Sequence, residues 1–383
     1  MQIEQSVWTV DAGWMPYPPG RSCASAQLVF VFGSRMLLES SAWLPAVQAA
    51  YPQAALIGCS TAGVIYDTTV LDQVVVVSAL QFQHSWVTHT SAPIATYEDS
   101  SRVGAYLAQT LPHEQLVHVF VLSDGLTING SDLVSGITQH LPEHVSVTGG
   151  LASDGEAFGR TMVLLNGQPE AQIVAAVGLY GSQLRIGYGS IGGWDPFGPE
   201  RLITRAKDNI LYELDGTSAL GFYKRYLGEH ADQLPASGLL FPRSLTIGNE
   251  TEQVVRTILS VNERDQSMTF AGDMPEGAYA RLMKTNFDRL IDGAINAASA
   301  SVAPLADQQA EFALLISCVG RKLVLQQRIE EEVEGVRDVL GHQAVLAGFY
   351  SYGEISPLMS TGRCALHNQT MTITTLSERT EGP

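Results

Sequence analysis

The stretch that decides the fold is AQLVFVFGSRMLLESSAWLPAVQAAYPQAALIGCSTAG, residues 26–63. It opens with an almost wholly apolar run that ends at Gly33 and continues through a segment with helix-like spacing of apolar residues. It closes with a second apolar run that leads into Gly-Cys-Ser-Thr-Ala-Gly. Strands that are apolar along their whole length are typical of parallel sheets, because helices cover both faces of such sheets. The stretch therefore predicts a β-α-β unit with a right-handed crossover.

Two further stretches repeat this pattern. LVHVFVLSDG (116–125) and VSVTGGLASDG (145–155) flank a second helical segment, and FALLISCVGR (312–321) and AVLAGFYSYGE (344–354) flank a third. Each copy reads strand, polar glycine-containing turn, helix, strand and glycine-rich turn. We therefore predict an α/β fold built from repeated β-α-β units.

Segments of a different character separate the copies. The runs at 73–82 and 173–191 read as long antiparallel strands, and Asn166-Gly167 between apolar residues is a hairpin signal. The fold is therefore expected to contain mixed sheets. A polar stretch with Pro and Gly favours a domain boundary near residues 215–235.

Composition narrows the class of protein. Of 383 residues, 45% are hydrophobic and 16% charged, which is enough for a large buried core. The net charge of −17, from 39 acidic and 22 basic residues, argues against binding to nucleic acid or to an anionic membrane. We expect no signal peptide, no transmembrane helix and no disulfide framework from four scattered cysteines, and hence a cytoplasmic protein with free thiols.

The polar turns all follow predicted strands. Ligands of parallel α/β sheets bind at the carboxyl ends of the strands, so the topology is expected to gather these turns around one rim. The residues expected there are Ser34, Cys59, Ser60, Thr61, Ser123, Asp124, Ser153, Asp154, Cys318, Arg321, Tyr352 and Glu354.

The turns offer weak signals for catalysis. GCSTAG differs from the Gly-x-Ser-x-Gly nucleophile elbow because its second glycine comes one residue late, at Gly63, and no histidine base can be assigned to Cys59. A packed, inert thiol is the more ordinary role for such a cysteine. Asp124 and Asp154, each beside glycine, fit a ligand site or a capped turn equally well.

Two other segments offer ligand contacts. Cys364-x-x-His367 supplies only two of the four ligands of a structural zinc site, but His367 as neutral imidazole is able to hydrogen-bond a ligand or to hold haem iron. In GGWDPFGPE (192–200), Trp194 and Phe197 fit an apolar pocket wall or a plug at the end of a sheet.

Seven segments of the chain resemble the FIST family of sensory proteins. They are GCSTAG, GGLASDG, GWDPFGP, AGDMPEG, SCVGR, GFYSYGEISP and HNQTMTITTL. The resemblance implies a two-domain architecture. The expected division is an N-terminal extension at 1–24, a FIST N domain at 25–220, a FIST C domain at 221–376 and a tail at 377–383.

The resemblance implies a sensor and no enzyme. Some stand-alone bacterial members of similar length belong to the nitric-oxide-sensing haemoprotein branch (NosP). A resemblance to this branch implies a haem b cofactor and a partner histidine kinase or cyclic-di-GMP enzyme. His367 is then the expected axial ligand of haem iron, with His140 and His144 as rivals. A homo-oligomer is an open alternative.

The ligand site is expected to draw on the turns and motifs together. Its expected residues are Cys59, Ser60, Thr61, Asp124, Asp154, Trp194, Cys318, Arg321, Tyr352, Glu354 and Asn368. One alternative is a sensor of a small polar metabolite such as an amino acid, with Asp124 and Asp154 facing the ammonium group and Arg321 the carboxylate. Another is a hydrolase or transferase that uses Cys59 or Cys318.

Overall fold

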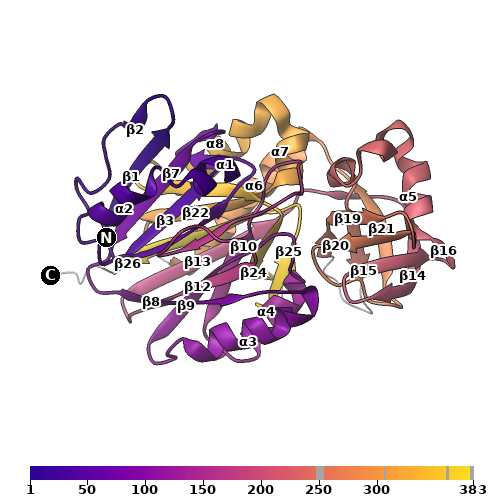
Figure 1. Cartoon of the computed structure of the whole chain (residues 1–383), viewed down its shortest axis with the longest axis horizontal. Helices are drawn as coiled ribbons and strands as arrows, with labels where there is room; N and C mark the ends of the chain where they lie inside the picture. The colour runs from indigo at the N-terminus through magenta and orange to yellow at the C-terminus, as the bar shows by residue number, and fades with distance from the viewer. Residues whose placement is uncertain (247–253, 306–307, 359–361, 380–383) are drawn as a thin grey trace.

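The computed structural model describes residues 1–246, 254–305, 308–358 and 362–379. It consists of a body made of three six-stranded sheets and a smaller lobe, residues 195–284, which lies at the right of Figure 1. Mixed sheets and the three β-α-β units confirm the expected fold class.

The first sheet contains the β-α-β unit of residues 26–63. Strands β3 (Leu28–Gly33) and β4 (Ala55–Ser60) pair in parallel, and α1 (Arg35–Ser40) and α2 (Leu44–Ala50) connect them. The other strands of this sheet are β1 (Gln2–Thr9), β2 (Gly13–Met15), β7 (Val75–Gln81) and β11 (Val163–Leu165).

The second sheet has the same plan. Strands β9 (Leu116–Ser123) and β10 (Ser146–Leu151) are parallel and α4 (Gly130–Thr138) connects them, while α3 (Ser100–Thr110) packs against α4. Asn129 begins α4 because its side-chain oxygen accepts hydrogen bonds from the backbone N–H groups of Ser131 and Asp132. The other strands are β8 (Trp86–Pro93), β12 (Ile173–Tyr180), β24 (Gly353–Pro357) and β25 (Cys364–His367).

The third sheet completes the body. Strands β22 (Phe312–Cys318) and β23 (Val345–Ser351) are parallel, and α7 (Val319–Leu325) and α8 (Ile329–Leu340) connect them. Helix α6 (Phe287–Val302) packs on α8 and on β13. The other strands are β5 (Val64–Tyr66), β6 (Thr69–Leu71), β13 (Leu184–Ile191) and β26 (Met371–Glu378).

The three repeats exchange strands. After the second parallel strand of each unit, the chain leaves its own sheet and pairs with the next one: β5 pairs with β23, β11 with β4, and β24 with β10. A later strand then returns antiparallel to the first strand of the unit, β7 on β3, β12 on β9 and β26 on β22. The repeats therefore interlock in a cyclic, threefold-like order.

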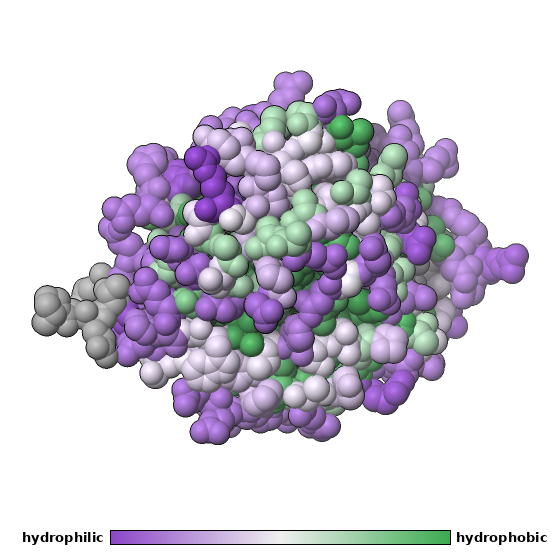
Figure 2. Space-filling model, turned by 60° about the vertical axis from the view of Figure 1, so that its left-hand side comes forward, coloured by the Kyte–Doolittle hydropathy of each residue, from purple (hydrophilic) through white to green (hydrophobic). Residues whose placement is uncertain are grey.

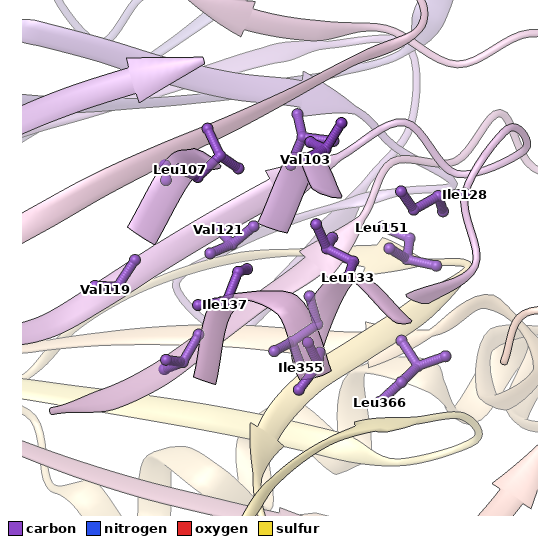
Figure 3. Packing of buried hydrophobic residues seen from close by; sticks show 14 of the residues in the cluster. Val103, Leu107, Val119, Val121, Ile128, Leu133, Ile137, Leu151, Ile355 and Leu366 are labelled. Atoms are coloured by element: carbon purple, nitrogen blue, oxygen red, sulfur yellow. The ribbon is translucent and has the colours of Figure 1, made fainter. Parts of the chain in front are cut away.

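The body core has a central part between the sheets and one part under the helices of each sheet. Between the sheets, Phe30 contacts Phe120 and Phe312 with ring centroids 5.2 and 5.8 Å apart. On the outer face of the second sheet, α3 and α4 bury an apolar cluster, where Leu133 and Ile137 of α4 face Val119 and Val121 of β9 (Figure 3). The apolar strands and the four-residue spacing on α4 are the pattern from which the units were predicted.

The lobe is an insertion in the third repeat, between β13 and α6. It has its own apolar core, and Thr285 Oγ1 donates to the Gly193 carbonyl at 2.7 Å, so the chain enters and leaves the lobe at one place. Its strands are β14 (Asp195–Lys207), β15 (Ile210–Leu214), β16 (Thr217–Ser218), β17 (Arg243–Thr246), β18 (Val254–Arg256), β19 (Ile258–Asn262), β20 (Ser267–Phe270) and β21 (Tyr279–Lys284). Its helical segments are α5 (Ala219–Leu227), η2 (Gly228–Gln233) and η3 (Ala236–Leu240).

The surface of the body is mixed in polarity. Figure 2 shows one face on which apolar residues lie in small groups between polar ones. No helix among the described residues has the length and apolar character needed to span a membrane.

Candidate functional site

The turns that follow β4, β10 and β23 meet in the structure. Ser153 N donates to the Ser60 carbonyl at 2.9 Å, and Tyr352 N donates to the Leu151 carbonyl at 3.2 Å. Ala62 N closes the ring by donating to the Tyr350 carbonyl at 3.0 Å. The strand exchange between sheets brings these turns together, because each turn carries the chain from one sheet to the next.

Several side chains of these turns form hydrogen bonds with other residues of the protein. Asp124 Oδ1 accepts hydrogen bonds from the backbone N–H groups of Leu126 and Thr127, at 2.9 and 2.7 Å, and its Oδ2 accepts from Thr161 Oγ1 at 2.7 Å. Ser60 Oγ accepts from Met162 N at 3.0 Å. These two residues therefore shape turns and have little capacity left for a ligand.

Arg321 is also committed within the protein. It forms an ion pair with Glu332 (Nη2–Oε2, 2.6 Å), and both side chains are fully buried. The same guanidinium donates to the carbonyls of Leu290 and Gly192, and Tyr350 OH donates to the other oxygen of Glu332 at 2.6 Å. The structure thus corrects the expectation that Arg321 faces a ligand carboxylate.

The two candidate nucleophilic cysteines lie in the interior. Cys59 lies within β4 and Cys318 at the end of β22, and neither is exposed to solvent. Burial raises the pKa of both thiols well above its ordinary value, so the reactive thiolate is disfavoured at neutral pH.

A first pocket, here called the rim pocket, opens beside the meeting turns. It has a volume of about 330 Å³, and its lining includes Ser34, Thr61 and Asp154 from the expected rim. Tyr352 OH donates to Asp154 Oδ1 at 2.5 Å, which holds that carboxylate in place. Sequence reasoning missed Arg35, which lines this pocket directly after Ser34.

A lysine that the sequence analysis also missed lies against the rim pocket. Lys322 Nζ donates to Asp72 Oδ1 at 2.6 Å and to the Ala62 carbonyl at 2.8 Å, and Asp72 and Ala62 both line the pocket. The only sequence signal for Lys322 was its position one residue after the SCVGR motif.

A second pocket, here called the joint pocket, lies where the lobe meets the body. Its volume is about 320 Å³. The body contributes the ends of β13 and β25, and the lobe contributes β18 and β21. The lining residues are Ser190, Ile191, Gly192, Gly193, Trp194, Val255, Met283, His367, Asn368 and Thr370.

His367 gives the joint pocket a neutral imidazole. Burial lowers the pKa of His367 to about 4, so the ring is uncharged at neutral pH. Its Nε2 lies 2.9 Å from the Ser356 carbonyl. Since a carbonyl only accepts, we assign the proton to Nε2, which leaves Nδ1 as a hydrogen-bond acceptor.

The turn from His367 to Thr370, here called the HNQT turn, connects the body to the lobe. Asn368 Oδ1 accepts from Thr257 N of the lobe at 3.2 Å, and its Nδ2 donates to the Tyr352 carbonyl of the body at 2.9 Å. Gln369 Nε2 donates to the Leu239 carbonyl at 2.9 Å. Gln369 has a positive φ of 64°, which is uncommon for a residue with a side chain and indicates a tightly constrained turn.

Glu354 holds the other end of this turn. Its Oε2 accepts from Thr370 N at 3.1 Å and from Thr370 Oγ1 at 2.9 Å, and Ser351 Oγ donates to Oε1. The carboxyl is fully buried, and burial raises its pKa to about 8. Glu354 therefore stabilises the HNQT turn through its hydrogen bonds to Thr370.

The described residues contain no group of three or more His, Cys, Asp or Glu side chains that could hold a metal ion. Cys364 does not act together with His367, because its Sγ donates to the Val147 carbonyl at 3.4 Å. His140 Nδ1 lies 2.9 Å from the Gly136 carbonyl of its own helix, and His144 is exposed beside a different pocket.

Comparison with known families matches the FIST N domain to residues 27–217 and the FIST C domain to residues 219–357. The chain belongs to the FIST family. FIST domains are sensor domains of signal transduction. No curated protein matches the chain. Among solved structures, a cyanuric acid hydrolase from A. caulinodans is 10% identical, with 99% of each chain covered and a TM-score of 0.35.

Several of the segments that resemble the FIST family contain residues that lie at or next to the joint pocket. Trp194 of GWDPFGP donates its Nε1 hydrogen to the Gln369 carbonyl at 2.9 Å, and Arg321 of SCVGR binds the Gly192 carbonyl. In AGDMPEG, the Ala271 carbonyl accepts from Gly130 N at the start of α4. The HNQT turn itself lies beyond residue 357, where the FIST C match ends. The segments GWDPFGP and HNQTMTITTL therefore line the joint pocket, whereas residues of GCSTAG and GGLASDG line the rim pocket.

Proposed function

We propose that this FIST chain is a non-enzymatic sensor that binds a small ligand in the joint pocket and transmits binding through the position of its lobe. The observation that carries the proposal is the convergence of the motif residues on a pocket shared by the body and the lobe. A ligand that contacts both parts favours one arrangement of them over others, and such differential binding is what a sensor requires.

The lining of the joint pocket favours an uncharged ligand. Its described residues carry no charged side chain at neutral pH, because His367 is neutral there. Hydroxyl groups, glycine backbone and His367 Nδ1 offer hydrogen bonds, while Trp194, Val255 and Met283 offer apolar surface. A small molecule with one apolar face and one hydrogen-bonding edge fits this combination.

The residues around His367 do not fit haem. Its Nε2 is engaged with the Ser356 carbonyl, and the described lining has no cation to pair with the carboxylates of the macrocycle. Haem-based detection of nitric oxide therefore stays a prediction from the family resemblance. A titration with haem that gives no Soret band at a stoichiometric ratio would exclude it.

A small polar metabolite in the rim pocket is the second candidate. Arg35, Asp72 and Asp154 line that pocket with charges of both signs, as recognition of an amino acid requires. A thermal-shift screen of amino acids tests it, with Arg35→Gln as the variant that should lose any stabilisation. The cysteine-dependent alternative is disfavoured because both candidate thiols are buried.

The output of the proposed sensor is contact with a partner protein. A histidine kinase or a cyclic-di-GMP enzyme as that partner, and a cytoplasmic location, stay predictions from the resemblance and the composition. An affinity comparison of the chain with and without its ligand, against such an enzyme, tests the partner.

Ligand binding in the joint pocket is tested by measuring the melting temperature of the protein with each member of a library of uncharged and charged fragments. We expect stabilising hits among the uncharged fragments, and we expect Val255→Phe to abolish them because the larger side chain fills the pocket. Val254→Phe is the matched control, since Val254 precedes Val255 on β18 and does not line the pocket. Hits that stabilise the Val255→Phe protein as well as the native protein would contradict the proposal.

A further inference from the structure

The lobe contains a buried arginine that has no counterion among the residues that the structure describes. Arg243 begins β17, and only 1% of it is exposed. Its Nε and Nη2 atoms are buried and have no hydrogen-bond partner in the described part of the chain. Burial lowers the pKa of Arg243 to about 10, so the side chain remains a cation at neutral pH. Burial of a cation without a partner destabilises the folded protein, so a counterion that binds to this arginine would stabilise the lobe.

Aromatic rings offset only part of this cost. The Arg243 guanidinium carbon lies 5.0 Å from the centroid of the Tyr223 ring and 5.7 Å from that of Phe222. These are cation–π contacts, which attract the charge but accept none of its N–H groups along the guanidinium edge. The Tyr223 hydroxyl donates to the carbonyls of Phe241 and Gly238, at 2.6 and 3.2 Å, and neither Nε nor Nη2 of Arg243 is paired with it.

A second arginine lies over the same ring. The Arg201 guanidinium carbon is 4.6 Å from the Phe222 centroid, and its Nε is also buried without a partner. Its Nη1 donates to Asp215 Oδ2 at 2.9 Å, and about a third of the side chain, 34%, is exposed. Arg201 and Arg243 therefore both lie near the Phe222 ring, and each has at least one buried donor without a partner within the described ranges.

Arg205 of the same lobe also lies over an aromatic ring, but it has a carboxylate partner within the chain. It lies 4.8 Å from the centroid of the Tyr212 ring, in the same kind of cation–π contact. Its Nε, however, is paired with Glu213 Oε1 at 3.1 Å. Arg205 is 56% exposed and still has a carboxylate partner, whereas Arg243 is enclosed and has none among the described residues, which points to an anion from outside the chain.

We propose that the lobe binds a small oxyanion, a carboxylate or a phosphate group, between Arg201 and Arg243. The planar guanidinium matches the two oxygens of such a group in a bidentate pair. The ligand approaches from the side of Arg201, because this side chain is partly exposed while Arg243 is enclosed. A small anion reaches Arg243 in this way, whereas a folded partner protein would have to unpack the lobe.

The charge distribution of the chain supports anion binding in the lobe. Ten of the 22 Lys and Arg residues lie in residues 195–284, with 13 Asp and Glu residues. The rest of the chain carries 12 basic and 26 acidic residues, so most of the net charge of −17 belongs to the body. The lobe, with a net charge of −3, therefore repels an anion less than the body does, with its net charge of −14.

The test is thermal unfolding of the full chain with sodium phosphate or sodium acetate, each compared with sodium chloride at the same ionic strength. We expect the native protein to gain stability with at least one of the two probes, and the probe that acts identifies the group as phosphate or carboxylate. Arg243→Met should abolish the gain while folding at least as well without the probe, since it removes an uncompensated buried charge.

Two further variants keep the test decisive. Arg201→Gln changes a partly exposed side chain and should reduce the gain even if Arg243→Met does not fold, whereas Arg205→Met should retain it. Phosphate stabilises many proteins by exclusion from their surfaces, so only a gain that depends on Arg201 and Arg243 supports the site. An equal gain in all variants, or none in the native protein, overturns it. Val255→Phe should leave the gain intact, which separates this site from the joint pocket.

Discussion

At the scale of single residues, the Arg321–Glu332 pair is the most sensitive point of the body. Both side chains are fully buried, so Glu332→Gln leaves a cation with a weakened partner in the core. We expect a loss of about 3–5 kcal/mol in the free energy of unfolding, measured with urea. Arg102→Gln, which removes the exposed pair with Asp99, is the control and should leave the urea midpoint unchanged. A similar small effect of both substitutions would contradict this assignment.

Glu354 gives the stability of the protein a particular dependence on pH. Its pKa is about 8 in the folded protein against an ordinary value of 4.5, so the folded chain keeps a proton that the unfolded chain has released between these values. The contribution of Glu354 to stability therefore falls as the pH rises from about 4.5 to 8 and is constant above that. Glu354→Gln should remove this fall, so the variant gains on the native protein between pH 5.5 and 8.5. Glu156→Gln, at an exposed position, should follow the native curve.

The sequence predicted which polar residues lie near one another but not what they do there. The predicted topology is enough to bring the polar turns together, because each turn follows the carboxyl end of a strand and these ends lie close to one another. The partners of these residues are far away in the chain: Asp124 binds Thr161, and Tyr352 binds Asp154, 198 residues earlier. No local pattern distinguishes a carboxylate that shapes a turn from one that awaits a ligand. Arg35 and Lys322 were missed for the same reason, since neither belongs to a recognisable motif.

At the scale of elements, the contact between α7 and the HNQT turn sets the position of the lobe. A Cβ atom on Gly320 would lie 2.3 Å from Gln369 Nε2, and Gln369 is fully buried. We expect Gly320→Ala to displace the Gln369 side chain and break its hydrogen bond to the Leu239 carbonyl. Amide hydrogen exchange should then rise in η3 and at Thr257, with little change in β9 and β10. Gly167→Ala, where a Cβ meets only ordinary contacts, is the control.

The parallel strands were predictable and the exchanged strands were not. Each parallel pair is a long apolar run, and burial on both faces leaves that mark in the sequence. The exchanged strands β5, β11 and β24 have only three to five residues, which is too short for a period to be seen. Each of these strands pairs with a strand of another repeat, so the pairing follows from the arrangement of all three repeats and not from the residues of the short strand itself.

At the scale of the whole molecule, the family division and the structural division differ. The two family matches meet between residues 217 and 219, which is the position of the short strand β16 inside the lobe. The third sheet takes β5 and β13 from the first matched part of the chain and β22, β23 and β26 from the second half. The lobe, in contrast, is one continuous insertion whose two ends lie together at Gly193 and Thr285.

Excision of the lobe and division of the chain should therefore have opposite results. When residues 194–284 are replaced by a short Gly-Ser linker, we expect the three-sheet body to fold, because Thr285 Oγ1 and the Gly193 carbonyl are already 2.7 Å apart and every sheet of the body keeps its strands. When the chain is divided into 1–217 and 218–383, we expect neither part to fold alone, since each lacks strands of the third sheet. Circular dichroism and thermal melting of the three proteins measure this. A cooperative melt of either half would show that the exchanged strands are not required for folding, and an unfolded body after excision would show that the lobe is required.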